Sequence, residues 1–337
     1  MTLLKWRVFN LALLLAVAVT MPGVINAQTA MTEIPLSSGS GGGGGAQTMS
    51  IGGMTLDGGE SMTAPAPSST AGPEAITFDG TYVWVATQFN NSITRIRVSD
   101  GAVAGTFTVG KRPVAVLYAG GFVWVANLLS NTITKVTPST GAIAATISVT
   151  DGPGGLAFDG TNLWIANRHS NTVTKLSTKG SILGTFAVGK RPIGLAFAAN
   201  SIWVANNFSN SVTRLSLAGA VLGTYAVGRG PFGVAAEGEN VWVTNYFSKS
   251  VTKLRAVDGF NLGEFTVGDG ASGIAFDGTS LWVVNNGDST VVKVSPSSGT
   301  VVATYATGKG PFSIAFGGSK VWVPNFASNS VSTTAAN

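Results

Sequence analysis

The pentapeptide Leu163-Trp164-Ile165-Ala166-Asn167 decides the fold, because close copies of it return along the chain at a nearly constant interval. Each copy has a tryptophan at its second position, and consecutive tryptophans are 39 or 40 residues apart: Trp84, Trp124, Trp164, Trp203, Trp242, Trp282 and Trp322. A period of this length indicates a repeat architecture, in which each unit buries its apolar faces against its neighbours. Seven such units fill most of the 337 residues.

Each unit contains four short apolar runs. In the third unit they lie at 156–158, 163–166, 172–176 and 182–188. The runs are rich in Val, Ile, Thr, Phe and Trp and are bounded by Gly, Asp, Asn and Ser, which is typical of strands. Asp159-Gly160 predicts a tight hairpin of type I′ between the first two strands. The chain is therefore predicted to be an all-β, seven-bladed β-propeller of four-stranded antiparallel blades, with the tryptophans packed between blades.

The N-terminal residues have the features of a secretory signal peptide. Lys5 and Arg7 precede an uncharged apolar run from Val8 to about Met21, and Ala27 offers a small residue for cleavage. A membrane anchor is the alternative, but the run is shorter than the roughly 20 residues that a spanning helix needs. We expect residues 1–27 to be removed, leaving no stable membrane span, and the protein to be exported to the periplasm or the extracellular space.

Residues 28–61 are dominated by Gly, Ser, Thr and Met and include five consecutive glycines, Gly41 to Gly45. Such a composition predicts a flexible, disordered linker. The propeller is then expected over 62–337. Its seventh unit ends too early to supply a fourth strand, so residues 62–70 are predicted to close the ring as that strand. Nothing in the sequence indicates an oligomer, and we expect a monomer.

The charge distribution and the cysteine content limit the possible functions further. The chain has no cysteine, so neither disulfides nor a lipidated N-terminal cysteine exist. The formal net charge is +5. In a four-stranded blade, the loop entering the first strand and the loop between the second and third strands share one end, here called the top face. Most cationic loop residues fall on this face and most acidic ones on the opposite face, so the ring is predicted to have a basic face and an acidic face.

The top face carries the candidate binding residues, because its side chains vary most from unit to unit. Aromatic residues and arginines mixed with polar turn residues are typical of interaction surfaces, and rigid scaffolds commonly present function in their loops. The alternative is that these are solvated turn residues that keep the protein soluble. The candidates are Lys111, Arg112, Arg168, His169, Lys190, Arg191, Phe208, Arg229, Phe232, Tyr246, Phe247, Lys309 and Phe312.

The repeat resembles a known family. The run 163–167, together with Ser170-Asn171-Thr172-Val173-Thr174-Lys175, resembles the YVTN-type β-propeller repeat, with tryptophan where the family has tyrosine. The resemblance covers residues 73–333. It implies the propeller fold, but the related NHL-type propellers include adhesive surface proteins, redox-associated periplasmic proteins and enzymes. Fold resemblance therefore leaves the activity open.

The enzymes among these relatives imply particular site residues. Similarity to virginiamycin B lyase implies a histidine base, glutamates and a magnesium ion, whereas this chain has one histidine, His169. Similarity to gluconolactonase-type propellers implies carboxylates at the channel mouth, where only Glu74 would provide one, and hard cations need several oxygen ligands. We therefore predict no catalytic residues, no metal site and no cofactor.

Three hypotheses for function follow. The first is an exported, non-catalytic binding scaffold whose basic top face engages a protein, a polysaccharide or another anionic partner. The alternative is a lyase or lactonase-like enzyme with a site at the top of the central channel. The third is binding of a polyanion or nucleic acid, which requires a continuous basic groove.

Overall fold

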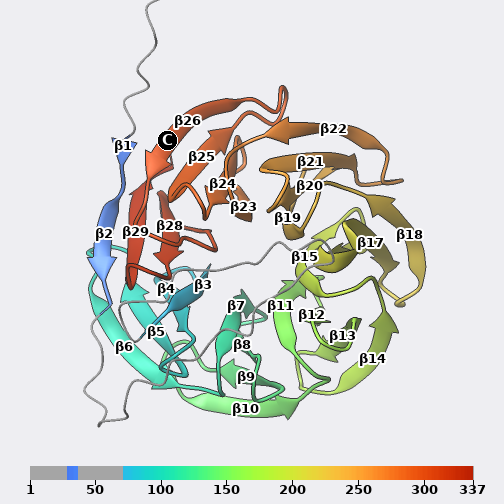
Figure 1. Ribbon diagram of the computed structural model, residues 1–337. Helices are drawn as coiled ribbons and strands as arrows, with labels where there is room; N and C mark the ends of the chain where they lie inside the picture. Colours follow the sequence, from blue (N-terminus) through green and yellow to red (C-terminus); the bar gives the residue numbers. More distant parts are fainter. Residues whose placement is uncertain (1–28, 37–70, 337) are drawn as a thin grey trace, which may run out of the picture.

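The computed structural model describes residues 29–36 and 71–336, which form a ring of seven β-sheets around a central axis (Figure 1). The predicted seven-bladed propeller is confirmed. The predicted signal peptide, residues 1–27, and most of the predicted linker lie outside the described residues. Within the described ranges no helix has the length and apolar character needed to cross a membrane. The helix found there is a single 3-10 turn, η1 (Asn207–Ser209).

The strands of each blade follow one another outward from the axis. Blades 1 to 4 consist of β3 (Pro73–Phe78), β4 (Tyr82–Thr87), β5 (Ser92–Arg97), β6 (Val103–Thr108); β7 (Pro113–Ala119), β8 (Phe122–Asn127), β9 (Thr132–Val136), β10 (Ile143–Ser148); β11 (Pro153–Phe158), β12 (Asn162–Asn167), β13 (Thr172–Ser177), β14 (Ile182–Ala187); and β15 (Pro192–Ala198), β16 (Ser201–Asn206), β17 (Ser211–Ser216), β18 (Val221–Ala226).

Blades 5 to 7 repeat this order, except at the outer edges of the last two. They consist of β19 (Pro231–Glu237), β20 (Asn240–Asn245), β21 (Ser250–Arg255), β22 (Asn261–Thr266); β23 (Ala271–Phe276), β24 (Leu281–Asn285), β25 (Thr290–Val294), β26 (Val301–Ala306); and β27 (Ala315–Gly317), β28 (Lys320–Asn325), β29 (Ser330–Ala335), β2 (Thr32–Pro35). In addition, β1 (Thr29–Ala30) pairs in parallel with β26.

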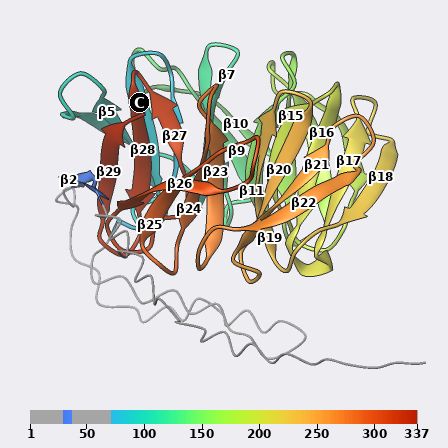
Figure 2. The same cartoon turned by 90° about the horizontal axis from the view of Figure 1, so that it is seen from above.

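The ring is closed by β2, which pairs antiparallel with β29 as the outer strand of blade 7 (Figure 2). The prediction that residues 62–70 supply this strand is therefore wrong, and those residues lie outside the described part of the chain. The part of the predicted linker at 29–36 is ordered strand instead. Its apolar side chains provide the reason, since Leu36 and Met31 are buried and Leu36 packs with Trp322 and Ile76 across the junction of blades 7 and 1.

The seven tryptophans pack between blades, as predicted, and none has exposed surface. Trp84 of blade 1, for example, packs against Val116, Val123 and Val125 of blade 2. Its indole Nε1 donates a hydrogen bond to the Asp79 carboxylate at 2.7 Å. The aspartate of the first hairpin therefore serves a second purpose, because it satisfies a buried donor that would otherwise be costly.

The first hairpins differ from the predicted type I′ turn in the blades that carry Asp-Gly. The central residues after Asp79 are Gly80 and Thr81, and only Gly80 has a positive φ, which is the type II′ pattern. In blade 4 the two central residues, Ala199 and Asn200, both have positive φ, as a type I′ turn requires. The aspartate side chain explains the difference, since Asp79 accepts hydrogen bonds from the backbone N–H groups of Thr81 and Tyr82.

Candidate functional site at the mouth of the central channel

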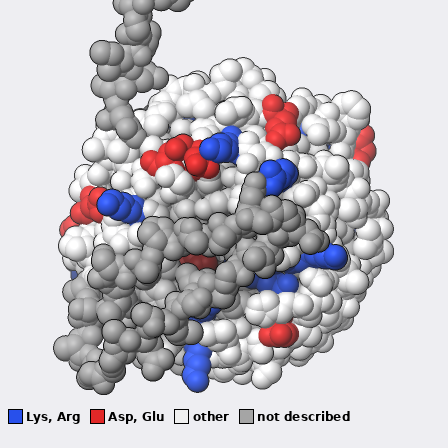
Figure 3. Space-filling model, viewed as in Figure 1, with Lys and Arg blue, Asp and Glu red and all other residues white. Residues whose placement is uncertain are grey.

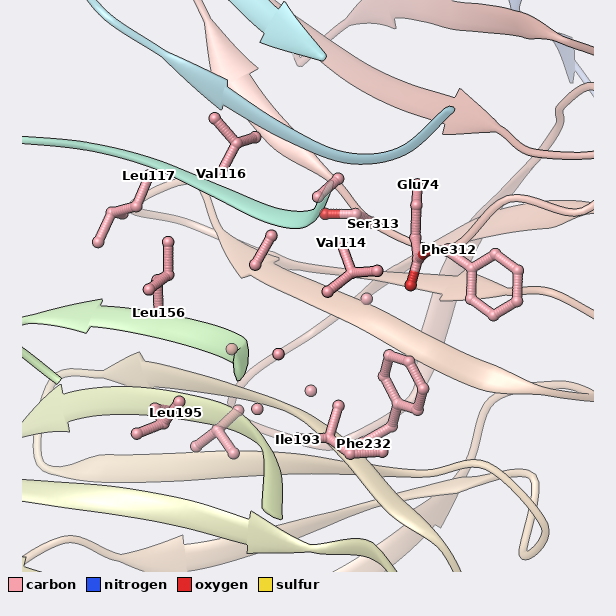
Figure 4. A pocket seen from close by; sticks show the side chains of 18 of the residues that line it. Glu74, Val114, Val116, Leu117, Leu156, Ile193, Leu195, Phe232, Phe312 and Ser313 are labelled. Carbon is pink, nitrogen blue, oxygen red and sulfur yellow. The ribbon is translucent and has the colours of Figure 1, made fainter. Parts of the chain in front are cut away.

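The inner strands of blades 1 to 6 and residues 312–314, just before β27 of blade 7, line a cavity of about 340 Å³ on the axis. Its mouth is formed by the second residue of the first strand or the equivalent position in six blades: Glu74, Val114, Gly154, Ile193, Phe232 and Phe312. The equivalent residue of blade 6, Ser272, is buried and does not line the cavity. Deeper in the channel lies a ring of aliphatic side chains two residues further on: Ile76, Val116, Leu156, Leu195, Val234, Ile274 and Ile314. Figure 4 shows Glu74, Phe232 and Phe312 at one end of the cavity and Leu156 and Leu195 at the other.

A second set of positions surrounds the mouth in every blade. The residue before the first strand in blades 1 to 6, and Gly310 in blade 7, lies in the left-handed region. Its carbonyl accepts a hydrogen bond from the N–H of the residue that follows the tryptophan strand. The residues that donate this bond are Gln88, Leu128, Arg168, Asn207, Tyr246, Asn286 and Phe326. Because the backbone is equivalent in all blades, differences among these side chains reflect something other than the fold.

Two arginines occupy the left-handed position. Five blades place glycine there (Gly72, Gly152, Gly230, Gly270 and Gly310), whereas Arg112 and Arg191 have φ of 53° and 52°. A residue with a Cβ atom adopts this conformation at a cost of about 1 kcal/mol or more, which glycine avoids. Local strain of this kind is concentrated at functional sites. Blades 2 and 4 therefore tolerate a destabilising residue at the mouth.

Arg168 of blade 3 lies between these two arginines in the ring order. Its side chain lies over Gly154, where any Cβ atom would overlap the guanidinium Nε. Glycine at this channel-facing position therefore makes the room that Arg168 occupies. The Nε atom is buried and has no hydrogen-bond partner among residues 29–36 and 71–336, and the same is true of Nη1 of Arg191. By contrast, Nε of Arg112 donates to Oε1 of Gln88 at 2.8 Å.

The three arginines form one electrostatic network with Glu74. Burial raises the pKa of the Glu74 carboxyl, although the positive charges of Arg168 and Arg112 oppose the change. Burial also lowers the pKa of Arg168. For Arg191, burial and the repulsion of Arg168 and Arg112 lower the pKa to about 10, so it stays protonated at neutral pH. With three cations and one carboxylate, the network has an excess of positive charge that no described residue neutralises.

The opposite side of the mouth is aromatic. The rings of Phe89, Phe326, Phe312, Phe232, Tyr246 and Phe247 contact one another in that order, with centroid separations of 5.5, 5.9, 6.3, 6.2 and 5.2 Å. Tyr246 also donates through its hydroxyl to Oδ1 of Asn286 at 3.0 Å. These contacts hold the rings in a rigid wall across the channel from the arginines.

The remaining predicted residues lie further out. Lys111, Lys190, Arg229 and Lys309 are exposed on the rim. Phe208 is also on the rim, where the guanidinium of Arg191 stacks on its ring with Cζ 4.6 Å from the centroid. His169 is about half exposed, and its Nδ1 lies 3.4 Å from Oδ1 of Asp151. The structure therefore brings together Arg112, Arg168, Arg191, Phe232, Tyr246, Phe247 and Phe312 at the mouth and leaves the other candidates outside it.

Four contributors to the mouth are absent from the sequence-based set of binding residues. Gln88 orients Arg112, Glu74 belongs to the charge network, and Phe89 and Phe326 continue the aromatic wall. Gln88 and Phe326 stand at the same repeat position as Arg168. Aligning this position across units would have identified them, since it is the most variable one beside the invariant tryptophan strand.

Charge is unevenly distributed on the face viewed in Figure 3, where many of the Lys and Arg side chains lie over blades 2 to 4 and acidic side chains lie over blade 6. The acidic loop residues of blade 6 are partly compensated, since Asp269 pairs with Lys249 at 3.3 Å. Within residues 29–36 and 71–336, no three His, Cys, Asp or Glu side chains come together as a metal site would require.

The fold and mouth define the chain as a seven-bladed β-propeller. It is similar to a solved structure of hydrazine synthase from Kuenenia stuttgartiensis, with a TM-score of 0.73, 19% identity and coverage of 82% of this chain and 99% of that one. The match to a streptogramin B lyase has a TM-score of 0.70 and 19% identity, and it covers 80% of this chain and 95% of the lyase. The match to virginiamycin B lyase from Staphylococcus aureus has a TM-score of 0.70 and 18% identity, and it covers 79% of this chain and 96% of the lyase.

These structural similarities establish the fold alone, because the identities are below 20%. Neither the protein-family models nor the curated protein sequences give a match. The YVTN-type assignment therefore stays a prediction.

Proposed function

We propose that this protein is an exported, non-catalytic binding protein, acting as a monomer, whose ligand is a small anion held at the channel mouth by Arg112, Arg168 and Arg191. One observation supports the proposal: two buried guanidinium N–H groups, on Arg168 and Arg191, have no hydrogen-bond partner in the described part of the chain. A buried donor left without an acceptor costs about 1–3 kcal/mol, and more when it is charged. An oxyanion bound there would satisfy both donors and neutralise the excess charge.

The test compares the central arginines with a rim cation. Binding of acetate and inorganic phosphate is measured by calorimetry and by the shift of the melting temperature. Arg168→Gln is expected to weaken anion binding at least tenfold, because it removes a charge-assisted contact. Lys190→Gln removes the same charge from an exposed position and is expected to change binding less than twofold. If neither anion binds the unaltered protein, the proposal is wrong.

Polyanion binding is distinguished by the same pair of variants. A long polyanion contacts the exposed rim, where Lys111, Lys190 and Lys309 lie, rather than the narrow mouth. Retention on heparin that falls with Lys190→Gln and not with Arg168→Gln would favour the polyanion. Our proposal expects the reverse ranking for a small anion. Export is checked separately by N-terminal sequencing of secreted protein, which is expected to begin at Gln28.

A lyase at the same mouth is the second candidate, and one observation favours it. The Glu74 carboxylate is desolvated and has a raised pKa, which is the usual state of a general base. Among similar folds, a catalytically inactive virginiamycin B lyase has been solved with quinupristin. Incubation with quinupristin followed by mass spectrometry tests this candidate. Loss of quinupristin that disappears in Glu74→Gln would establish the lyase and overturn the non-catalytic proposal.

A further inference from the structure

We propose that the ligand is an aromatic monocarboxylate, whose carboxylate lies on the three arginines while its ring packs on Phe232 and Phe312. This inference rests on the proposed function and specifies its ligand.

The mouth has two chemically different sides. Its cations come from blades 2, 3 and 4, through Arg112, Arg168 and Arg191. Its aromatic wall is centred on Phe232 of blade 5 and Phe312 of blade 7, which both line the cavity. A ligand that spans the mouth therefore meets guanidinium groups at one end and ring faces at the other. A simple inorganic anion would use only the first of these sides.

The aromatic rings are not required by the fold. The positions equivalent to Phe232 and Phe312 are filled elsewhere by Val114, Gly154, Ile193 and Ser272. In all of these blades the preceding residue pairs with the Asn that ends the tryptophan strand. Both rings retain exposed surface toward the cavity, although they contact each other at 6.3 Å between centroids. Aromatic faces held open at a cavity are available for stacking with a planar group.

The cavity has the size and polarity to hold the aromatic part of such a ligand. Below the mouth it is lined by aliphatic side chains, and Glu74 and Arg168 are the only charged residues among those that line it in the described chain. Its volume of about 340 Å³ lies at the lower end of the range of small-molecule sites, roughly 300–1,000 Å³. One aromatic ring with a short acid side chain fits this space, whereas a large polycyclic ligand does not.

The arginines favour a carboxylate as the anionic end of the ligand. Arginine forks match the two oxygens of a carboxylate. Arg168 lies over Gly154 at the mouth, and Arg112 and Arg191 of the flanking blades are electrostatically coupled to it. The other side of the mouth is the aromatic wall, whose described rings provide no cation for a second anionic group at the far end of the ligand. A monocarboxylate with an apolar body therefore matches both sides of the mouth.

The experiment separates the two ends of the ligand. Calorimetry with 3-phenylpropionate, acetate and 3-phenylpropanol provides the whole ligand, its anion alone and its ring alone. We expect 3-phenylpropionate to bind at least tenfold more tightly than either of the other two. If acetate binds as tightly as 3-phenylpropionate, the aromatic part of the inference is wrong while the proposed function stands. If no anion binds, both are wrong.

Two variants locate the ring, using residues that other blades already place at the same position. Phe232→Ile and Phe312→Val are expected to weaken 3-phenylpropionate binding three- to tenfold and to leave acetate unchanged. Phe260→Val is the matched control, since Phe260 is exposed by 59% on the outer edge of blade 5. It is expected to leave both ligands unchanged. An equal loss for acetate and 3-phenylpropionate in Phe312→Val would overturn the assignment of the ring to this wall.

Discussion

Replacing Arg191 by glycine is expected to make the protein more stable while it abolishes anion binding. Five of seven blades already place glycine at this position, so the backbone is suited to the change. Two costs disappear with the side chain. The left-handed conformation of a residue with a Cβ costs about 1 kcal/mol relative to glycine. The pKa change from 12.5 to about 10 corresponds to roughly 3 kcal/mol against the charged form, before discounting for remaining exposure.

Two losses oppose this gain. Glycine increases the conformational entropy of the unfolded chain, which costs about 1 kcal/mol. The stacking of the Arg191 guanidinium on Phe208 is lost as well, at about 0.5–1 kcal/mol for a partly exposed pair. The balance is a net stabilisation of about 1–2 kcal/mol, or a rise in melting temperature of about 3–6 °C for a domain of this size.

The measurement is thermal and urea unfolding of Arg191→Gly beside Lys190→Gly. Lys190 is the exposed neighbour and carries the same charge, so its replacement is expected to be neutral or destabilising. Acetate binding is measured on the same samples. If Arg191→Gly is less stable than the unaltered protein, the buried guanidinium is a stabilising structural group, and the inference that it awaits an anion is refuted.

Three further predictions concern other parts of the ring. Nε1 of Trp203 is buried without a partner among the described residues, whereas Nε1 of Trp242 donates to Glu237, which stands at the position equivalent to Ala198. Ala198→Glu should therefore raise the free energy of unfolding by about 1 kcal/mol, and Ala198→Leu should not. Leu36→Ala should lower the free energy of unfolding by about 2–3 kcal/mol, because Leu36 is buried at the ring closure. Thr32→Ala should change the free energy of unfolding by less than about 0.5 kcal/mol. Equal effects of the two substitutions would contradict closure of the ring by β2. For Glu74, whose pKa is raised in the folded state, the carboxyl contributes stability below pH 4.5 that is lost as pH rises through the folded pKa. The melting temperature of Glu74→Gln relative to that of the unaltered protein should therefore rise between pH 4 and pH 8. A melting-temperature difference that does not depend on pH would argue against burial as the cause of the raised pKa.

The fold was predictable because the same strand pattern occurs in seven successive units of the sequence. The tryptophan period gave the number of blades, and the turn residues gave four strands in each. Ring closure was missed because the prediction looked for a strand next to Pro73 in the sequence. A subtler signal was present: Glu33-Ile34 matches Glu264-Phe265 of blade 5. In the structure Ser330 donates to Glu33 as Ser250 donates to Glu264, and Ile34 lies against Gly101 of blade 1 as Phe265 lies against Gly299 of blade 6.

The candidate site was predictable only in part. Loop topology placed the arginines and aromatic residues on one face, but it did not distinguish Arg112 and Arg191 from the rim lysines beside them. That distinction depends on a left-handed backbone, and for Arg168 on the space left by Gly154. Both depend on three-dimensional contacts. The sequence signals that point to the mouth are the replacement of a repeated glycine by arginine in two units and the variable position after the tryptophan strand.

The central claim is that an anion with an aromatic body binds at the three arginines. Its most direct test is a crystal structure with 3-(4-bromophenyl)propionate, in which anomalous scattering locates the bromine independently of the protein. We predict the carboxylate within hydrogen-bond distance of Arg168 and Arg191 and the bromine inside the channel mouth beside Phe232 and Phe312. Bromine found only on the outer strands or beside the rim lysines, with the mouth free of ligand, would contradict the account.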